Sequence, residues 1–375
     1  MSHPRSERGA APVVITALGA VTSVGHSAPA SCAAIRAGIT RPRRVSHFEV
    51  LDSDTQDTVM LTAHPIHGFT EGFLGMGRWL RIARACVGEL LQTPGLPPAS
   101  DRSFWGRTGL TVATPAPDDE LFEPEGEDGL AGVREAYVRP LRDELGLAIR
   151  DEAVEVLGLG QVGVAAAVEL ALETLSRGTF ERCLVVAADS LLDPEALALL
   201  NEEGRLKTGD SAVGLMAGEA GACFLLERRS VARQRGATPL AGVSGVVLSE
   251  EKTHFFSGAP NQGLALADCI REVLTRTSSQ ARFEGDIYSD LNGESWRSQE
   301  WGMARVRLTE HLGEALNLHL PCTSVGDVGT ASGALGICLA VYDLARGHGR
   351  TGHALSLSSS HWGDVGCVSL HAEGD

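Results

Sequence analysis

The sequence is poor in aromatic residues and in lysine, and it has no long apolar run. Aromatic residues make up 5% of its 375 residues, and Lys207 and Lys252 are its two lysines. No stretch reaches the roughly 18–20 apolar residues that a membrane-crossing helix requires. The first residues, MSHPRSERGAAP, also lack the apolar core of a secretory signal. We therefore expect a cytoplasmic protein with no membrane partner.

Basic residues are scarce relative to acidic ones. The chain has 32 Lys and Arg residues against 48 Asp and Glu residues, and its formal net charge is -16 at pH 7. This charge opposes non-specific attraction to nucleic acid, so we expect no nucleic-acid partner. The eight cysteines form no CxxC pair, and most lie in apolar stretches, such as Cys183 in CLVVAA. This pattern is typical of buried free thiols.

Small and apolar residues are abundant, with 44 glycines and 43% hydrophobic residues. The length predicts about two or three domains, or one large duplicated unit. Continuous apolar runs predict buried strands, and apolar spacings of three and four residues predict helices. The expected strands are 13–18, 108–114, 153–157 and 183–190, and the expected helices are 29–36, 78–91 and 164–178. The pattern is weak from 46 to 70, and the acidic segment 118–129 is expected to be a solvated insertion.

Two regions of the chain share one pattern of elements. Each of 153–190 and 328–360 has a Gly-rich turn, a small-residue helix that ends in Arg-Gly, and an apolar strand. The valines of the turns, Val162 and Val328, are separated by nearly the same length of chain as the terminal arginines, Arg177 and Arg346. A helix and a strand precede each region, and for the second they are expected at 264–274 and 286–292. We therefore predict an α/β fold of two duplicated halves, residues 1–240 and 241–375, whose mostly parallel sheets enclose the apolar helices.

The Gly-rich turn of the first half admits a second interpretation. Gly158–Gly163 (GLGQVG) matches the dinucleotide-binding pattern GxGxxG between a strand and a helix. Asp189 ends the following strand, not far from where a ribose-binding carboxylate belongs. However, the motif lies mid-chain, and the second half has a similar turn at 326–333. We therefore favour a property of the duplicated scaffold and expect no cofactor.

The sequence offers little support for a metal site. His64 and His67 lie in the segment HPIH, and an acidic run extends from Asp52 to Asp57. The acidic run lacks the glycine and the glutamate that a calcium loop requires. We therefore predict no bound metal.

Five segments resemble, in order and spacing, landmarks of the β-ketoacyl synthases (3-oxoacyl-ACP synthases) of the thiolase superfamily. They are VVITALGAVTSVG (13–25), the segment from Gln161 through CLVVAADS (161–190), MAGEAGACFLLE (216–227), DIYSDLNGES (286–295) and SVGDVGTASGALG (324–336). The resemblance covers nearly the whole chain. It implies a five-layered αβαβα thiolase-like fold of two duplicated halves, whose active site lies where the two central helices begin. It also implies a homodimer, or a heterodimer with a ketosynthase-like subunit.

The resemblance also implies that the family's reactive positions have changed. It places the nucleophilic cysteine at Gln161, the two catalytic histidines at Asn292 and Thr330, and a lysine near Val325. A carboxamide is no nucleophile, and Asn and Thr cannot replace the histidines of a decarboxylative condensation. His361 lies where the family has its gating loop. Gln161, Asn292, Thr330 and His361 are therefore expected to form a vestigial acyl pocket without catalytic residues.

The expected function is that of a ketosynthase-like protein without condensing activity. One interpretation is a scaffold or adaptor for a protein cargo, similar to accessories of type VI secretion effectors. The alternative is a subunit similar to a chain-length factor, in which glutamine stands at the nucleophile position and the partners are a ketosynthase and an acyl carrier protein. A third interpretation, an acyltransferase with an unrecognised nucleophile, stays open, although neither Cys86, Cys183 nor Cys322 lies at a helix start beside a basic group.

Overall fold

A computed structural model describes residues 12–52, 55–116, 129–277 and 282–374. The acidic segment predicted as a solvated insertion lies outside these residues, apart from Gly129. Ten strands form one continuous sheet in the order β10-β9-β11-β12-β8-β1-β7-β6-β4-β5. The strands are β1 (Val13–Thr22), β4 (Thr108–Thr114), β5 (Val154–Gly158), β6 (Arg182–Ser190), β7 (Glu219–Arg228), β8 (Ala241–Glu250), β9 (Asp286–Ser289), β10 (Asn317–His319), β11 (His353–Ser359) and β12 (Asp364–His371).

The strand order confirms the predicted duplication. When the five strands of each half are numbered along the chain, they lie in the sheet in the order 3-2-4-5-1. This order is β5-β4-β6-β7-β1 in the first half and β10-β9-β11-β12-β8 in the second. In both halves the first three strands of this arrangement are parallel, but the other two join the sheet antiparallel. The prediction of mostly parallel sheets is therefore wrong, because each half combines parallel and antiparallel strands. The halves meet where Val13–Ile15 of β1 pairs with Ala241–Val243 of β8. The predicted division at residues 240 and 241 coincides with the start of β8 and stays a prediction.

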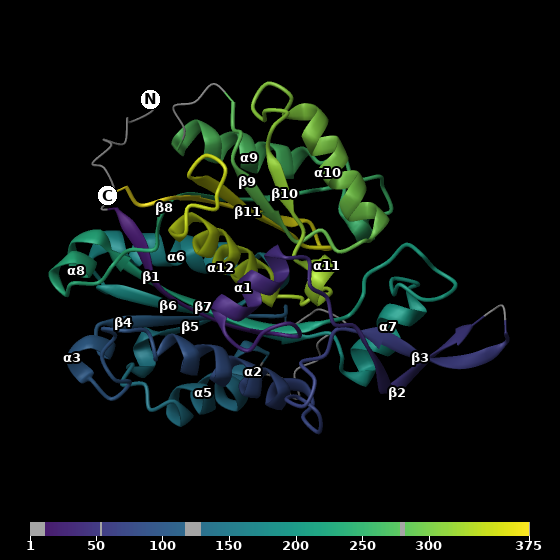
Figure 1. Cartoon of the computed structure of the whole chain (residues 1–375), viewed down its shortest axis with the longest axis horizontal. Coiled ribbons are helices and arrows are strands. Elements are labelled where there is room, and N and C mark those ends of the chain that lie inside the picture. Colours follow the sequence, from purple (N-terminus) through teal and green to yellow (C-terminus); the bar gives the residue numbers. More distant parts are fainter. Residues whose placement is uncertain (1–11, 53–54, 117–128, 278–281, 375) are drawn as a thin grey trace.

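The helices and the two halves of the sheet form five layers (Figure 1). Helices α6 (Gly163–Arg177) and α12 (Ala331–Ala345) lie in the middle layer, between the two halves of the sheet. Helices α2 (Gly75–Leu90) and α5 (Arg139–Glu144) cover the outer face of the first half. Helices α9 (Leu264–Thr277) and α10 (Ser295–Arg307) cover the second. This is the αβαβα arrangement predicted above.

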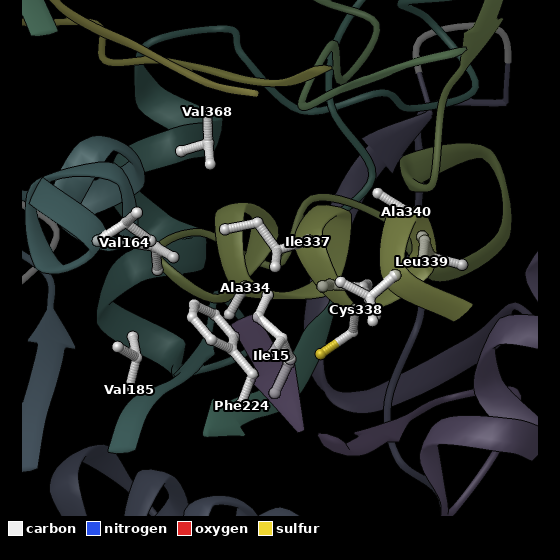
Figure 2. Close-up of a cluster of buried hydrophobic side chains, with 14 of the residues drawn as sticks. Ile15, Val164, Val185, Phe224, Ala334, Ile337, Cys338, Leu339, Ala340 and Val368 are labelled. Carbon is white, nitrogen blue, oxygen red and sulfur yellow. The ribbon is translucent and has the colours of Figure 1, made fainter. Parts of the chain in front are cut away.

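The central helices are rich in small and apolar residues because most of their surface is covered, α12 more completely than α6. Of the 15 residues of α12, 12 are buried. Figure 2 shows Ile337 and Cys338 of this helix packed among Ile15 and Phe224 from the sheet and side chains from both halves. A Cβ atom at Gly333 would lie 3.1 Å from the Cβ of Val164, so a glycine lets α12 approach α6 closely.

The region with the weak sequence pattern forms a hairpin of its own. Strands β2 (Arg43–Asp52) and β3 (Asp57–Ala63) pair antiparallel and extend away from the main body (Figure 1). The strand expected at 286–292 ends at Ser289, because Asp290 instead pairs with the buried Arg297 at 2.9 Å. The remaining helices are α1 (Ala28–Arg36), α3 (Arg102–Trp105), α4 (Leu130–Val133), α7 (Pro194–Glu202), α8 (Arg229–Gln234) and α11 (Cys322–Val325). Within the described ranges, no helix is both long and apolar enough to span a membrane.

Candidate functional site

A cavity of about 540 Å³ lies where the two central helices begin, and both Gln161 and Thr330 line it. Gln161 stands in a short turn (Gly160–Val162) before α6, and Thr330 immediately precedes α12. Each follows a glycine with positive φ, 52° at Gly160 and 54° at Gly329. The two turns are therefore equivalent. Gln161 and Thr330 are separated by the same length of chain as Arg177 and Arg346 near the ends of the two helices, and by slightly more than Val162 and Val328.

Asp189 joins the two halves beneath this cavity. It lies near the end of β6 of the first half, is 3% exposed and lines the same cavity. Its Oδ2 accepts the backbone N–H of Thr330 at 2.8 Å, and its Oδ1 accepts that of Ser190 at 2.7 Å. Burial, with a smaller contribution from the Asp327 carboxylate, raises the pKa of Asp189 to about 7, although these backbone N–H groups act in the opposite direction. Asp189 therefore caps the start of α12 with a carboxyl that titrates near neutrality.

The order of the strands does not support the dinucleotide-binding alternative. In a dinucleotide-binding βαβ unit, the strand before the glycine turn and the strand after the following helix are neighbours in the sheet. Here β4 lies between β5 and β6. The Asp189 carboxylate is also bonded to backbone N–H groups of the α12 turn and of its own strand.

The other two predicted pocket residues lie outside the cavity. Asn292 is buried and donates to Glu294 at 2.8 Å and to Asp327 at 2.6 Å. Asp327 in turn accepts the backbone N–H of Gly329 at 2.9 Å, so Asn292 supports the Thr330 turn from behind. His361 is buried between β11 and β12, where its ring meets Phe256 edge-on at 5.6 Å. The structure thus brings Gln161 and Thr330 together and places Asn292 and His361 elsewhere.

The cavity wall offers no activated nucleophile. Among the described residues that line it, none is a cysteine, a histidine or a lysine. Burial raises the pKa of Cys183 to about 11 and that of Cys322 to about 12, so these thiols stay protonated at neutral pH. Ser190 lines the cavity, but its hydroxyl donates to Glu219 at 2.9 Å and has no imidazole or amine base beside it. Hydroxyls without such a base are weak nucleophiles.

Sequence reasoning missed two acidic residues of the cavity wall and considered the third, Asp189, only as a ribose-binding carboxylate. Asp193 and Glu195, at the start of α7, line the cavity together with Asp189. A signal for Asp189 was available, because ligands of open α/β sheets bind at the carboxyl ends of the strands. As for metal ions, His64 is buried and His67 pairs with Glu71 at 3.0 Å. Across the described ranges, no cluster of three or more ligand side chains could hold a metal ion.

Comparisons with known proteins identify the fold. No protein-family model matches the sequence, and no curated protein matches it. The chain aligns with AntDE:AntF, a type II PKS acyl-carrier protein in complex with its ketosynthase, with TM-score 0.78 and 16% identity over 98% of this chain and 100% of that one. It aligns with the ishigamide ketosynthase/chain length factor with TM-score 0.76 and 20% identity over 98% of this chain and 100% of that one.

A modular enzyme provides a third match. The ketosynthase from module 6 of the bacillaene synthase from Bacillus subtilis 168 aligns with TM-score 0.77 and 12% identity over 97% of this chain and 72% of that one. All three matches extend over nearly the whole chain, and they agree with the repeated strand order and the five layers. The chain therefore has the fold of the thiolase-like ketosynthases.

Proposed function

We propose that this protein is a ketosynthase-fold subunit that binds an acyl group without forming carbon–carbon bonds. The proposal rests on the composition of the cavity wall at the two helix starts. Gln161 and Thr330 occupy the two turns, and among the described residues of the wall there is no thiol, imidazole or amine. A volume of about 540 Å³ is within the range of about 300–1,000 Å³ typical of small-molecule sites. The pocket can thus hold a ligand that it cannot attack.

The residues of the cavity wall suit an acyl chain with a polar carbonyl. Leu74, Met76 and Trp79, at the start of α2, supply apolar surface. Among the described residues, none hydrogen-bonds the half-buried carboxamide of Gln161, so it is available to donate to a ligand carbonyl. In this role Gln161 orients a thioester or an amide and forms no covalent bond.

A chain-length-factor-type role, paired with an active ketosynthase and an acyl carrier protein, is the form of this function that we favour. Its support is the likeness of the fold to a ketosynthase/chain length factor and to a ketosynthase complex with an acyl-carrier protein. The second candidate is an adaptor for a protein cargo, of the type VI secretion kind or another. The projecting β2–β3 hairpin supports it, because Leu51 and Met60 are 57% and 45% exposed there.

Mass spectrometry tests the non-condensing role. The purified protein is incubated with acyl-pantetheine and malonyl-pantetheine, and both the intact mass and released CO2 are measured. We expect neither a covalent adduct nor CO2 above the rate of a protein-free sample. A stoichiometric adduct or catalysed CO2 release would overturn the proposal.

Binding of a non-hydrolysable acyl-pantetheine amide tests the role of Gln161. We expect Gln161→Ala to weaken binding about fivefold, because one hydrogen bond is worth about 1 kcal/mol. The matched control is Gln234→Ala, at an exposed position on α8, which should leave the affinity unchanged. Equal affinities of the wild type and Gln161→Ala would remove Gln161 from the binding site. Co-purification with an active ketosynthase, or with an unrelated cargo protein instead, distinguishes the two candidate partners.

A further inference from the structure

The cavity at the helix starts has a strongly one-sided charge. Three acidic side chains line it, those of Asp189, Asp193 and Glu195, and the Asp189 carboxyl is fully ionised only above neutral pH. Among the described residues of its wall, none is an arginine, a lysine or a histidine. Asp189 is buried, Asp193 is half-buried and Glu195 is exposed, so the charge extends from the floor of the cavity to its rim.

Nearby positive charge is already neutralised. Arg78 donates to Ser190 in the cavity wall at 3.3 Å, but its guanidinium also lies 3.6 Å from the fully buried carboxylate of Glu219. The start of each central helix contributes about half a positive charge. At α12, Asp189 accepts the N–H of Thr330 and so compensates this partial charge. The starts of α2 and α7 also line the cavity, and Asp193 accepts the backbone N–H of Gly75 at 3.2 Å. At about half a positive charge each, the helix starts reduce the negative charge of the three acidic side chains but do not cancel it.

Two further polar groups in the wall lack complete partners. The carboxamide of Gln161 makes no hydrogen bond to the residues that the structure describes. The hydroxyl of Thr330 is 1% exposed and lies beside the Asp189 carboxyl, but it makes no well-formed hydrogen bond. Buried polar groups are normally hydrogen-bonded, so the buried Thr330 hydroxyl points to a polar group of a ligand, which the half-buried carboxamide of Gln161 can also contact.

We propose that this cavity prefers ligands that carry a primary ammonium group over isosteric neutral ligands, and that it rejects carboxylates such as a malonyl group. The inference rests on the proposed non-condensing function and names the substrate class of the same site. An ammonium ion donates three hydrogen bonds and can be received by carboxylates, a carboxamide oxygen and a hydroxyl. A carboxylate would instead meet like charges and find no basic partner among the described residues of the wall. The proposed ligand is therefore an amine-bearing acyl group.

A thiol placed in the cavity measures this charge directly. In Gln161→Cys, the rates of modification by two methanethiosulfonate reagents, one with an ammonium and one with a sulfonate head, are compared at pH 8. The ratio of the two rates is divided by the same ratio for 2-mercaptoethanol. A cleft lined by charges of one sign raises the local concentration of the opposite ion about 10-fold or more, so we expect a normalised ratio of at least about 10.

Charge-neutral variants supply the matched controls. Asp193→Asn and Glu195→Gln, each in the Gln161→Cys background, should lower the normalised ratio severalfold. Glu202→Gln removes the same charge from an exposed position near the end of α7, away from the cavity, and should leave the ratio unchanged. A ratio near 1, or a ratio that responds equally to all three variants, would overturn the inference.

Direct binding to the wild-type protein keeps the test independent of the cysteine variant. Binding of hexylammonium, hexanamide and hexanoate is measured by ligand-observed NMR, and we expect affinity to fall in that order. Hexanoate binding as tight as hexylammonium binding would refute the charge preference. This failure is distinct from failure of the proposed function, which would show as a covalent acyl adduct on the wild type whatever the order of these affinities.

Discussion

Gln161→Cys places a thiol at the start of α6, and we predict that this thiol is not an activated nucleophile. A cysteine becomes reactive when a basic group, a metal or a helix start lowers its pKa from about 8.5. At this position no basic side chain lines the cavity among the described residues, and the Asp189 carboxyl lies in the same wall. The thiol should therefore behave as an ordinary one.

The expected pKa of the introduced thiol follows from the opposing effects of the helix start and the nearby carboxylates. The helix start stabilises a thiolate by about 0.3–1 kcal/mol, which lowers the pKa by about 0.2–0.7 units. The carboxylates of Asp189 and Asp193 oppose this effect by a comparable amount. The pKa of the introduced thiol thus stays near 8.5, and about 3% of it is thiolate at pH 7.

The assay is the pH dependence of alkylation by iodoacetamide, followed by intact mass. The background is low, because burial raises the pKa of native thiols such as Cys183, Cys269 and Cys322 to between about 11 and about 12. We expect a midpoint between about pH 8 and 9 for the introduced thiol. Thr330→Cys, at the equivalent position of the second half, should react more slowly because Thr330 is 1% exposed. A midpoint below pH 7 for Gln161→Cys would refute the reasoning.

Two further predictions concern stability. Glu227 is fully buried and pairs with Arg182 at 3.2 Å and with Arg235 at 2.5 Å. Glu227→Ala should therefore lower the free energy of unfolding, measured in urea, by about 3–5 kcal/mol. The control Arg107→Ala breaks an exposed ion pair and should lower it by less than about 1 kcal/mol. Equal losses in the two variants would contradict this prediction. The pKa of Asp189 is raised from 3.8 to about 7, so the native state holds a proton that the unfolded chain releases, and this contribution to stability is lost as pH rises from about 4 to 7. Between about pH 4 and 7, the free energy of unfolding of Asp189→Asn should rise by on the order of 4 kcal/mol relative to that of the wild type. A stability difference between the two proteins that does not depend on pH would argue against the raised pKa.

Much of the fold could be predicted because its signals are local. The apolar runs of β4 and β6 and the small-residue patterns of α6 and α12 lie within single elements. Their repetition along the chain predicted the duplication that the strand order confirms. The β2–β3 hairpin was missed, because most of its strand residues are exposed and a period-2 apolar pattern requires one buried face.

The candidate site was predicted in part. Gln161 and Thr330 were named through the resemblance to the β-ketoacyl synthases, and each lies at a Gly-rich turn before a central helix that is visible in the sequence. Asn292 and His361 were expected in the same pocket, but the hydrogen bonds of Asn292 to Glu294 and Asp327 and the packing of His361 against Phe256 hold them outside it. Partner choice among buried polar groups depends on distances between elements, which no local pattern contains.

By itself, the sequence determined the elements and the duplication, because each is a property of short segments. The correspondence of Gln161, Asn292 and Thr330 to the reactive positions of the β-ketoacyl synthases stays a prediction from the resemblance. Only the tertiary structure decided which charges share the cavity. Asp189 and Glu195 lie beyond the whole of α6 from Gln161 in the chain, and Thr330 lies in the other half. They meet because β6 ends and α7 begins beside the two helix starts, and that proximity results from the packing of the layers. The acidic character of the site is therefore a property of the fold.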